Sequence, residues 1–129
     1  MWRIIVALSL ACAGLRHSAW ASQPAPSRRP ACTHNPKALR SGLLVRPQAV
    51  RRVAPDFHGL PPITGNIFIE MDLDETGKVT QACIVKGLRD DVDDATLRAI
   101  RQWRFTPGKS RSRTPVAVIQ AIAVPVDIK

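Results

Sequence analysis

Apolar and polar side chains alternate clearly between Gly65 and Leu73, and this alternation limits the folds open to the chain more than any other feature. The apolar positions are Ile67, Ile69, Met71 and Leu73, and the intervening positions include Phe68, Glu70 and Asp72. Because successive side chains of a strand point to opposite faces of a sheet, the pattern predicts a strand with one buried face. Asp74–Gly77 is predicted to form a turn, with glycine where positive φ is needed. Val79–Lys86 then returns as the second strand of a hairpin.

The stretch Val92–Pro107 combines a helical repeat with an aromatic end. Stepping about 100° per residue puts its apolar and small side chains on one arc, which contains Val92, Ala95, Thr96, Ala99, Ile100 and Trp103. Asp90 is expected to cap the first turn, and Pro107 disfavours helical geometry at Thr106. The sequence therefore predicts a helix that packs one face on the core and stops near Thr106.

The chain closes with a long apolar segment, Pro115–Ile128. One parity is apolar except at Gln120, and its apolar members are Val116, Val118, Ile122, Val124, Val126 and Ile128. Pro125 cannot donate a ladder hydrogen bond, which either favours an edge position for this strand or limits its pairing to the residues before Pro125. Together the elements predict an α+β fold of order β-β-α-β, in which the helix crossover places the third strand beside the first. The expected result is a three-stranded antiparallel sheet with one helix packed on one face.

The N-terminus has the features of a secretory signal peptide. Met1–Arg3 is a short positive segment, Ile4–Leu15 is an apolar run, and Ala19–Ala21 is an A-x-A cleavage site. A spanning helix needs about 20 apolar residues, and this run is shorter. We therefore expect export and cleavage after Ala21, and the alternative is an uncleaved membrane anchor.

Residues 22–45 are rich in proline, serine and arginine, which predicts an exposed linker before a domain that covers residues 46–129. The chain has a formal net charge of +9 at pH 7. For an exported protein this charge suits anionic envelope surfaces or acidic loops of membrane proteins, whereas basic charge alone is weak support for nucleic acid. No nucleic-acid partner is expected. The simpler interpretation of the basic linker is a solvated segment that keeps the protein soluble.

Cleavage leaves two cysteines, Cys32 and Cys83. An even count in an oxidising compartment suggests a disulfide, which would contribute roughly 4 kcal/mol through loop-closure entropy. The alternative is a buried strand thiol at Cys83 and a free Cys32. Cys32 and His34 could supply two metal ligands, but no neighbouring residue completes a tetrahedral set, so no metal site and no other cofactor is expected.

Catalytic motifs are not found in the sequence. Asp72–Gly77 imitates the first half of a calcium-binding loop, but its twelfth position is Cys83 rather than a bidentate glutamate. His58 has no serine or cysteine nucleophile spaced to form a relay with it. The sequence therefore predicts a protein that is not an enzyme.

Two motifs make the chain similar to a known family. The first is D-x-x-G-x-V, at Asp74, Gly77 and Val79. The second is A-x-x-x-W-x-F-x-P, at Ala99, Trp103, Phe105 and Pro107. With this order and spacing, residues from about Val45 to Lys129 resemble the C-terminal domain of TonB proteins, which implies a periplasmic β-β-α-β module. We expect structural roles for Trp103, Phe105 and Gly77.

The resemblance also implies a partner. TonB proteins connect a proton-driven inner-membrane motor to outer-membrane transporters, and their C-terminal domain adds the transporter's TonB-box peptide as a strand beside its last strand. By resemblance, the partner-binding residues are expected to be Val116, Val118, Gln120, Ile122 and Val124. Phe57 is also expected to bind the partner, because it stands in the position of the aromatic residue in the family's P-x-Y-P motif, with His58 in place of the second proline.

Three functional hypotheses follow. The first is an exported, non-catalytic module that binds the TonB-box peptide by strand addition and takes part in TonB-dependent transmembrane transport. The second is a structural envelope protein of the same fold that self-associates edge to edge, as in a homodimer, or attaches to anionic surface polymers. The third is an inner-membrane-anchored energy transducer, which applies if the N-terminus stays uncleaved.

Overall fold

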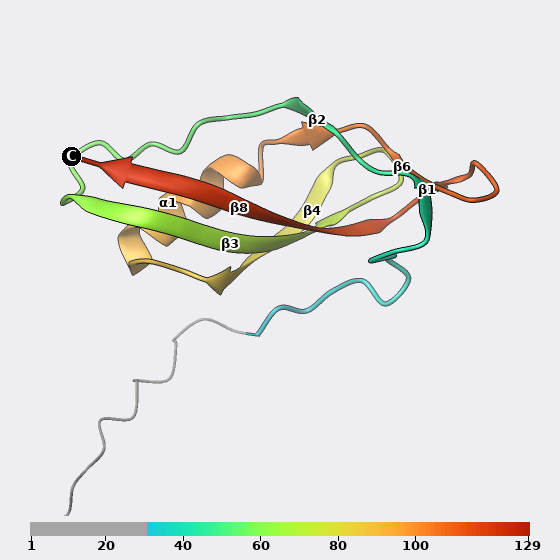
Figure 1. The fold of residues 1–129 in the computed structure, drawn as a ribbon, viewed down its shortest axis with the longest axis horizontal. Helices are drawn as coiled ribbons and strands as arrows, with labels where there is room; N and C mark the ends of the chain where they lie inside the picture. The colour runs from blue at the N-terminus through green and yellow to red at the C-terminus, as the bar shows by residue number, and fades with distance from the viewer. Residues whose placement is uncertain (1–30) are drawn as a thin grey trace, which may run out of the picture.

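The computed structural model describes residues 31–129 of the chain. The predicted signal peptide and the first part of the predicted linker lie outside the described residues. Along residues 31–129 the elements are β1 (Leu43–Val45), β2 (Ala49–Arg51), β3 (Ile63–Leu73), β4 (Val79–Lys86), α1 (Asp90–Ile100), β5 (Arg104–Phe105), β6 (Gly108–Ser110), β7 (Pro115–Val116) and β8 (Val118–Ile128) (Figure 1). In this part of the chain, no helix is long and apolar enough to cross a membrane.

A three-stranded antiparallel sheet forms the centre of the fold, with β3 between β4 and β8. β3 and β8 pair along their whole length, from Ile63 opposite Ile128 to Leu73 opposite Val118. The long green and red arrows of Figure 1 are these two strands, and α1 packs on one face of their sheet. The predicted α+β class is therefore confirmed, as is the position of the last strand beside the first strand of the hairpin.

The buried face of β3 has the parity that the sequence predicts. Four of its apolar side chains are at most 1% exposed, and they are Ile67, Ile69, Met71 and Leu73. They join Val92 and Ile100 of α1 in a single hydrophobic core. The opposite face of β3 presents Phe68, Glu70 and Asp72, and this outer face has no helix over it in the described residues.

The predicted C-terminal end of the helix is wrong. α1 ends at Ile100, and the backbone amides of Gln102 and Trp103 donate to carbonyl oxygens only three residues back, in a tight closing turn. Trp103 therefore follows the helix and is not part of it. The chain then extends as β5, which pairs with β2. This long-range pairing overrides a local helical repeat that continues to Trp103.

The predicted N-cap is also wrong. Arg89 holds the N-cap position and makes no side-chain capping bond, while Asp90 is already helical. The carboxylate of buried Asp93 instead accepts a hydrogen bond from the backbone amide of Leu88, at 2.9 Å. The start of the helix is thus fixed by an acid inside the first turn.

The predicted strand Pro115–Ile128 is divided into two. β7 pairs with β6 in a small sheet with β1, whereas β8 belongs to the main sheet. Ala117 lies between them, where the chain passes from one sheet to the other. The even parity of the apolar residues continues through this break, so the hydrophobic pattern alone does not reveal it.

Residues 31–45, which the composition predicts to be linker, pack on the domain. Cys32 forms a disulfide with Cys83 of β4, and β1 pairs with β6. The domain boundaries themselves remain predictions, but the ordered contacts begin well before residue 46. These contacts join residues far apart in the sequence, and local composition carries no signal of them.

Candidate peptide-binding site

One edge of the main sheet, along β8, has backbone groups that face away from β3. The amide of Ile119 donates to the carbonyl oxygen of Leu39, at 3.0 Å, and Leu39 lies on the side of β8 away from β3. The backbone groups of Ile119 therefore face away from β3. Alternate residues of a regular antiparallel strand direct their backbone groups to the same side, and no register shift interrupts the β3–β8 ladder. The backbone groups of Ala121, Ala123 and Asp127 therefore also face away from β3.

Within residues 31–129, no segment pairs with this side of β8 beyond Ile119. Pro125 has the same parity as the outward-facing residues, so its missing N–H leaves a gap in the edge and not in the ladder to β3. We call the stretch Ala121–Asp127 the open edge. It offers a partner strand the N–H groups of Ala121, Ala123 and Asp127.

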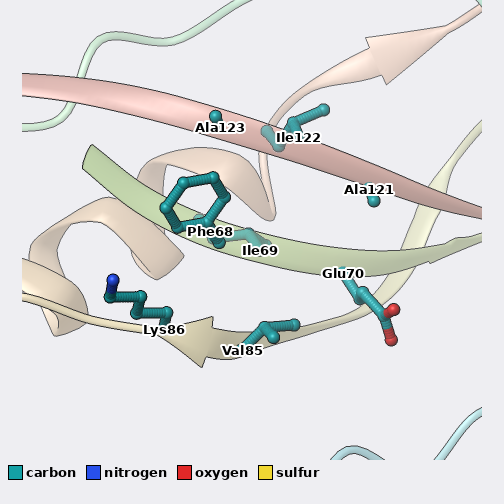
Figure 2. Close-up of a pocket in the computed structure, with 8 residues that line it drawn as sticks. All are labelled: Phe68, Ile69, Glu70, Val85, Lys86, Ala121, Ile122 and Ala123. Carbon is teal, nitrogen blue, oxygen red and sulfur yellow. The ribbon is translucent and has the colours of Figure 1, made fainter.

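A hollow of about 510 Å³ adjoins the open edge on the outer face of the sheet. It is lined by residues of all three strands of the main sheet: Phe68, Ile69, Glu70, Val85, Lys86, Ala121, Ile122 and Ala123 (Figure 2). Phe68 is 42% exposed and lies opposite Ala123 in the β3–β8 register. Because Ala121 and Ala123 have small side chains, they leave room beside the phenyl ring. We call this space the Phe68 hollow.

Charged groups lie at opposite sides of the Phe68 hollow, and Figure 2 shows Lys86 and Glu70 there. A hydrogen bond from the Arg40 guanidinium, at 2.9 Å, lowers the pKa of Glu70, and a further bond from His34 acts in the same direction. Burial opposes this shift without reversing it. Glu70 is therefore ionised at neutral pH. The hollow is apolar in the middle with one charge of each sign on its border.

The segment before β1 is fastened to the other end of the same face. The imidazole of His34 bonds to Asp72 through Nδ1, at 2.5 Å, and to Glu70 through Nε2, at 2.7 Å. The bond to Asp72 is the main cause that raises the pKa of His34 above its ordinary value. Asp72 is buried, and its other oxygen accepts the backbone amide of Asn35. These contacts hold the segment that brings Leu39 to the beginning of β8.

The comparison with protein families finds a match that spans residues 62–126 and is described as the Gram-negative bacterial TonB protein C-terminal family. This chain belongs to that family. TonB C-terminal domains are in general not catalytic, are associated with the Gram-negative envelope and interact with outer-membrane transporters. The chain thus contains a TonB-like module of the kind involved in TonB-dependent transport. The comparison with curated proteins gave no match.

The predicted partner-binding residues of this TonB C-terminal module do not lie together on an exposed surface. Val116 belongs to β7, and Val118 is 1% exposed in β8. Three others in β8 are half-buried, and they are Gln120, Ile122 and Val124. Phe57 packs against the hydrophobic core from the segment between β2 and β3. The predicted strand does lie at the edge of the sheet, but its even-numbered apolar side chains point toward the helix and the core.

The sequence did not single out Ala121, Ala123 and Phe68, which the structure places at the open edge and the Phe68 hollow. Pro125 contained the signal for the first two, since a proline in a paired strand must have the parity that faces away from the neighbouring strand. The outward-facing residues of β8 have odd numbers, whereas the predicted partner-binding residues of this strand have even numbers. Phe68 was assigned correctly to the outer face, but nothing local indicated that the residues opposite it would be small.

The structural residues of the TonB C-terminal module connect its two motifs. Trp103 donates through Nε1 to the carbonyl oxygen of Val53, at 2.8 Å, and the Arg52 guanidinium lies over its ring. Gly77 has φ of 85° and lies against the backbone of Phe105. Trp103 is half-buried on the edge of the core, where it fastens the segment that leads into β3.

Proposed function

We propose that this module binds the TonB-box peptide of an outer-membrane transporter as an added strand along the open edge of β8. The supporting observation is the open edge itself, with outward N–H groups at Ala121 and Ala123 beside an apolar hollow. An extended peptide can take these groups as hydrogen-bond donors and supply its own in return. The module acts in the periplasm, after cleavage at Ala21, and has no catalytic role.

The geometry also gives the peptide a preferred pattern. Side chains of an added strand alternate between the two faces of the enlarged sheet. Those on the outer face pass over Ala121 and Ala123 and reach the Phe68 hollow, so they are best apolar. Those on the other face meet the rim of the core near Ile122 and Val124.

Weak binding is expected from this edge. A backbone hydrogen bond contributes a net of about 0.5–1.5 kcal/mol, and Pro125 removes one of the donors. Leu39 covers the first part of the strand, which shortens the edge further. Such an interaction suits a partner that must be bound and released repeatedly.

A titration of the mature protein with a synthetic TonB-box peptide tests this proposal. We expect the largest amide shifts in an NMR spectrum at Ala121 and Ala123, and smaller ones at residues that face β3, such as Ile122. Unchanged amides along β8 at millimolar peptide would refute strand addition.

The same open edge favours a second candidate, which is edge-to-edge self-association. Two copies paired along β8 would protect the same amides without any peptide. Sedimentation equilibrium of the mature protein separates the two candidates. A dimer that dissociates when TonB-box peptide is added would mean that the second copy and the peptide bind the same edge. A protein that is monomeric without peptide would favour the peptide as the partner of the open edge.

A further inference from the structure

Three residues of metal-binding types come together away from the open edge. The donor atoms of Cys32, His34 and Cys83 all lie within 4.8 Å of one another. Only Cys32 and His34 are close together in the sequence, and Cys83 comes from β4. In the structure the two sulfurs are joined as a disulfide, so neither is a thiolate ligand in this state.

Glu70 brings a further oxygen donor next to His34. One of its carboxylate oxygens lies 2.7 Å from Nε2 of His34, and the residue is directly opposite Cys83 in the β3–β4 register. Its side chain is 23% exposed, which leaves it free to adjust. Arg40 binds the other oxygen and brings a positive charge to the cluster.

Asp72 is placed to orient the imidazole. One of its oxygens accepts a hydrogen bond from Nδ1–H of His34, and the other accepts a hydrogen bond from the Asn35 amide. Its side chain is 4% exposed. Metal-bound histidines usually donate their other ring N–H to a carboxylate, which sets the tautomer and the ring orientation. His34 therefore already has the support that a histidine ligand needs to bind through Nε2.

We propose that reduction of the Cys32–Cys83 disulfide converts this cluster into a tetrahedral zinc site with Cys32, Cys83, His34 and Glu70 as ligands. A dithiol reductant transfers two electrons and two protons to the disulfide and becomes a disulfide itself. The two protein thiols then release their protons as Zn²⁺ binds both sulfurs, and His34 releases the Nε2 proton that it donates to Glu70 in the disulfide state. Ligand atoms around tetrahedral zinc lie roughly 3.3–3.8 Å apart. The donor atoms of Cys32, His34 and Cys83 already lie within 4.8 Å of one another, so these three need only small side-chain shifts.

The ligand set favours zinc over harder cations. Two thiolates and one imidazole are typical of zinc sites, whereas Mg²⁺ and Ca²⁺ require mostly oxygen ligands. Two thiolates, a carboxylate and Zn²⁺ leave one negative charge, which Arg40 balances. The disulfide and the bound metal would thus be two alternative ways to hold residues 32–39 against the sheet, up to the contact of Leu39 with β8.

Cobalt is the probe of choice, because Co²⁺ bound by thiolates absorbs strongly and reports tetrahedral geometry. The mature protein is reduced with a phosphine that does not bind the metal, and Co²⁺ is titrated in under argon. We expect thiolate-to-cobalt charge-transfer and tetrahedral d–d bands that saturate at one Co²⁺ per chain and disappear when Zn²⁺ is added. The oxidised protein should give no such bands.

Matched variants test the individual ligands. Glu70→Gln and Asp72→Asn should each weaken cobalt binding by about 10-fold or more, whereas Glu75→Gln, at an exposed turn carboxylate, should leave it unchanged. Amide spectra of the oxidised variants check that each one folds. Two results would overturn the proposal: no tetrahedral bands in the reduced protein, or bands that His34→Ala and Glu70→Gln leave unaltered.

Discussion

The backbone amide of Phe105 donates a hydrogen bond to the carbonyl oxygen of Gly77, at 3.0 Å. This contact joins the turn of the β3–β4 hairpin to the chain that leaves the helix. A Cβ atom at position 77 would lie 1.9 Å from the carbonyl oxygen of Phe105. The two family motifs are therefore two halves of one packing contact.

Gly77→Ala should lower the free energy of unfolding by about 2 kcal/mol or more. The left-handed backbone costs a residue with a side chain roughly 1–2 kcal/mol, and displacement of Phe105 adds to that cost. Gly59→Ala is the control, because Gly59 also has positive φ but no atom within 4 Å of the added Cβ. Urea denaturation of both variants measures the difference. Equal losses would mean that the contact with Phe105 adds nothing.

Trp103→Phe should destabilise the fold by about 1 kcal/mol, because the phenyl ring cannot donate to the carbonyl oxygen of Val53. Peptide binding at the folded protein should stay the same, since Trp103 lies outside the open edge. Thermal denaturation and a peptide titration on the same sample separate the two effects. Lost binding at unchanged stability would assign Trp103 to the binding surface instead.

Acid should weaken the hairpin turn at Asp74. Burial raises the pKa of this carboxyl, but hydrogen bonds from Thr76 and the Lys78 amide outweigh burial and hold the pKa below its ordinary value of 3.8. A lowered pKa in the folded state means that the stabilisation is complete above the unfolded pKa and is lost as pH falls through the folded pKa.

The variant Asp74→Asn should therefore lose less stability than the wild type between about pH 5 and pH 2. Urea midpoints at a series of pH values measure this, with Glu75→Gln as the neighbouring control. Identical slopes in the wild type and Asp74→Asn would show that Asp74 has no role in the acid response.

Reduction of the Cys32–Cys83 disulfide, in the presence of a metal chelator, should loosen the segment that binds Leu39 to β8. The amide of Ile119 faces Leu39, whereas the amide of Gln120 faces β3. Hydrogen exchange at Ile119 should accelerate at least tenfold more than exchange at Gln120. Parallel acceleration at both amides would indicate global unfolding, as expected if the loss of roughly 4 kcal/mol of loop-closure entropy exceeds the remaining stability.

The main sheet could be predicted because its signals are local. The alternation of β3, the turn at Gly77 and the length of β4 are all written within short stretches of sequence. The end of α1 could not be predicted in the same way. It depends on the pairing of β5 with β2, residues that lie about fifty positions earlier in the chain.

The candidate site was predicted in part. The last strand is the edge strand, as Pro125 suggested, but hydrophobic residues such as Val118 mark the side chains of the core and not the backbone groups that a partner meets. The alternation of β3 already places Glu70 and Asp72 on one face, but the docking of His34 between them depends on contacts that span 36 and 38 positions of the chain. Their contact with residues 32–40 therefore had no sequence signal.

The most direct test of peptide binding compares Ala123→Pro with Ala123→Ser. Both keep the β3 ladder, because the amide of Ala123 faces away from β3, but only proline removes the outward N–H group. Isothermal titration of the mature variants with TonB-box peptide should show affinity reduced roughly tenfold for Ala123→Pro and unchanged for Ala123→Ser. Equal affinities in two folded variants would contradict strand addition along β8.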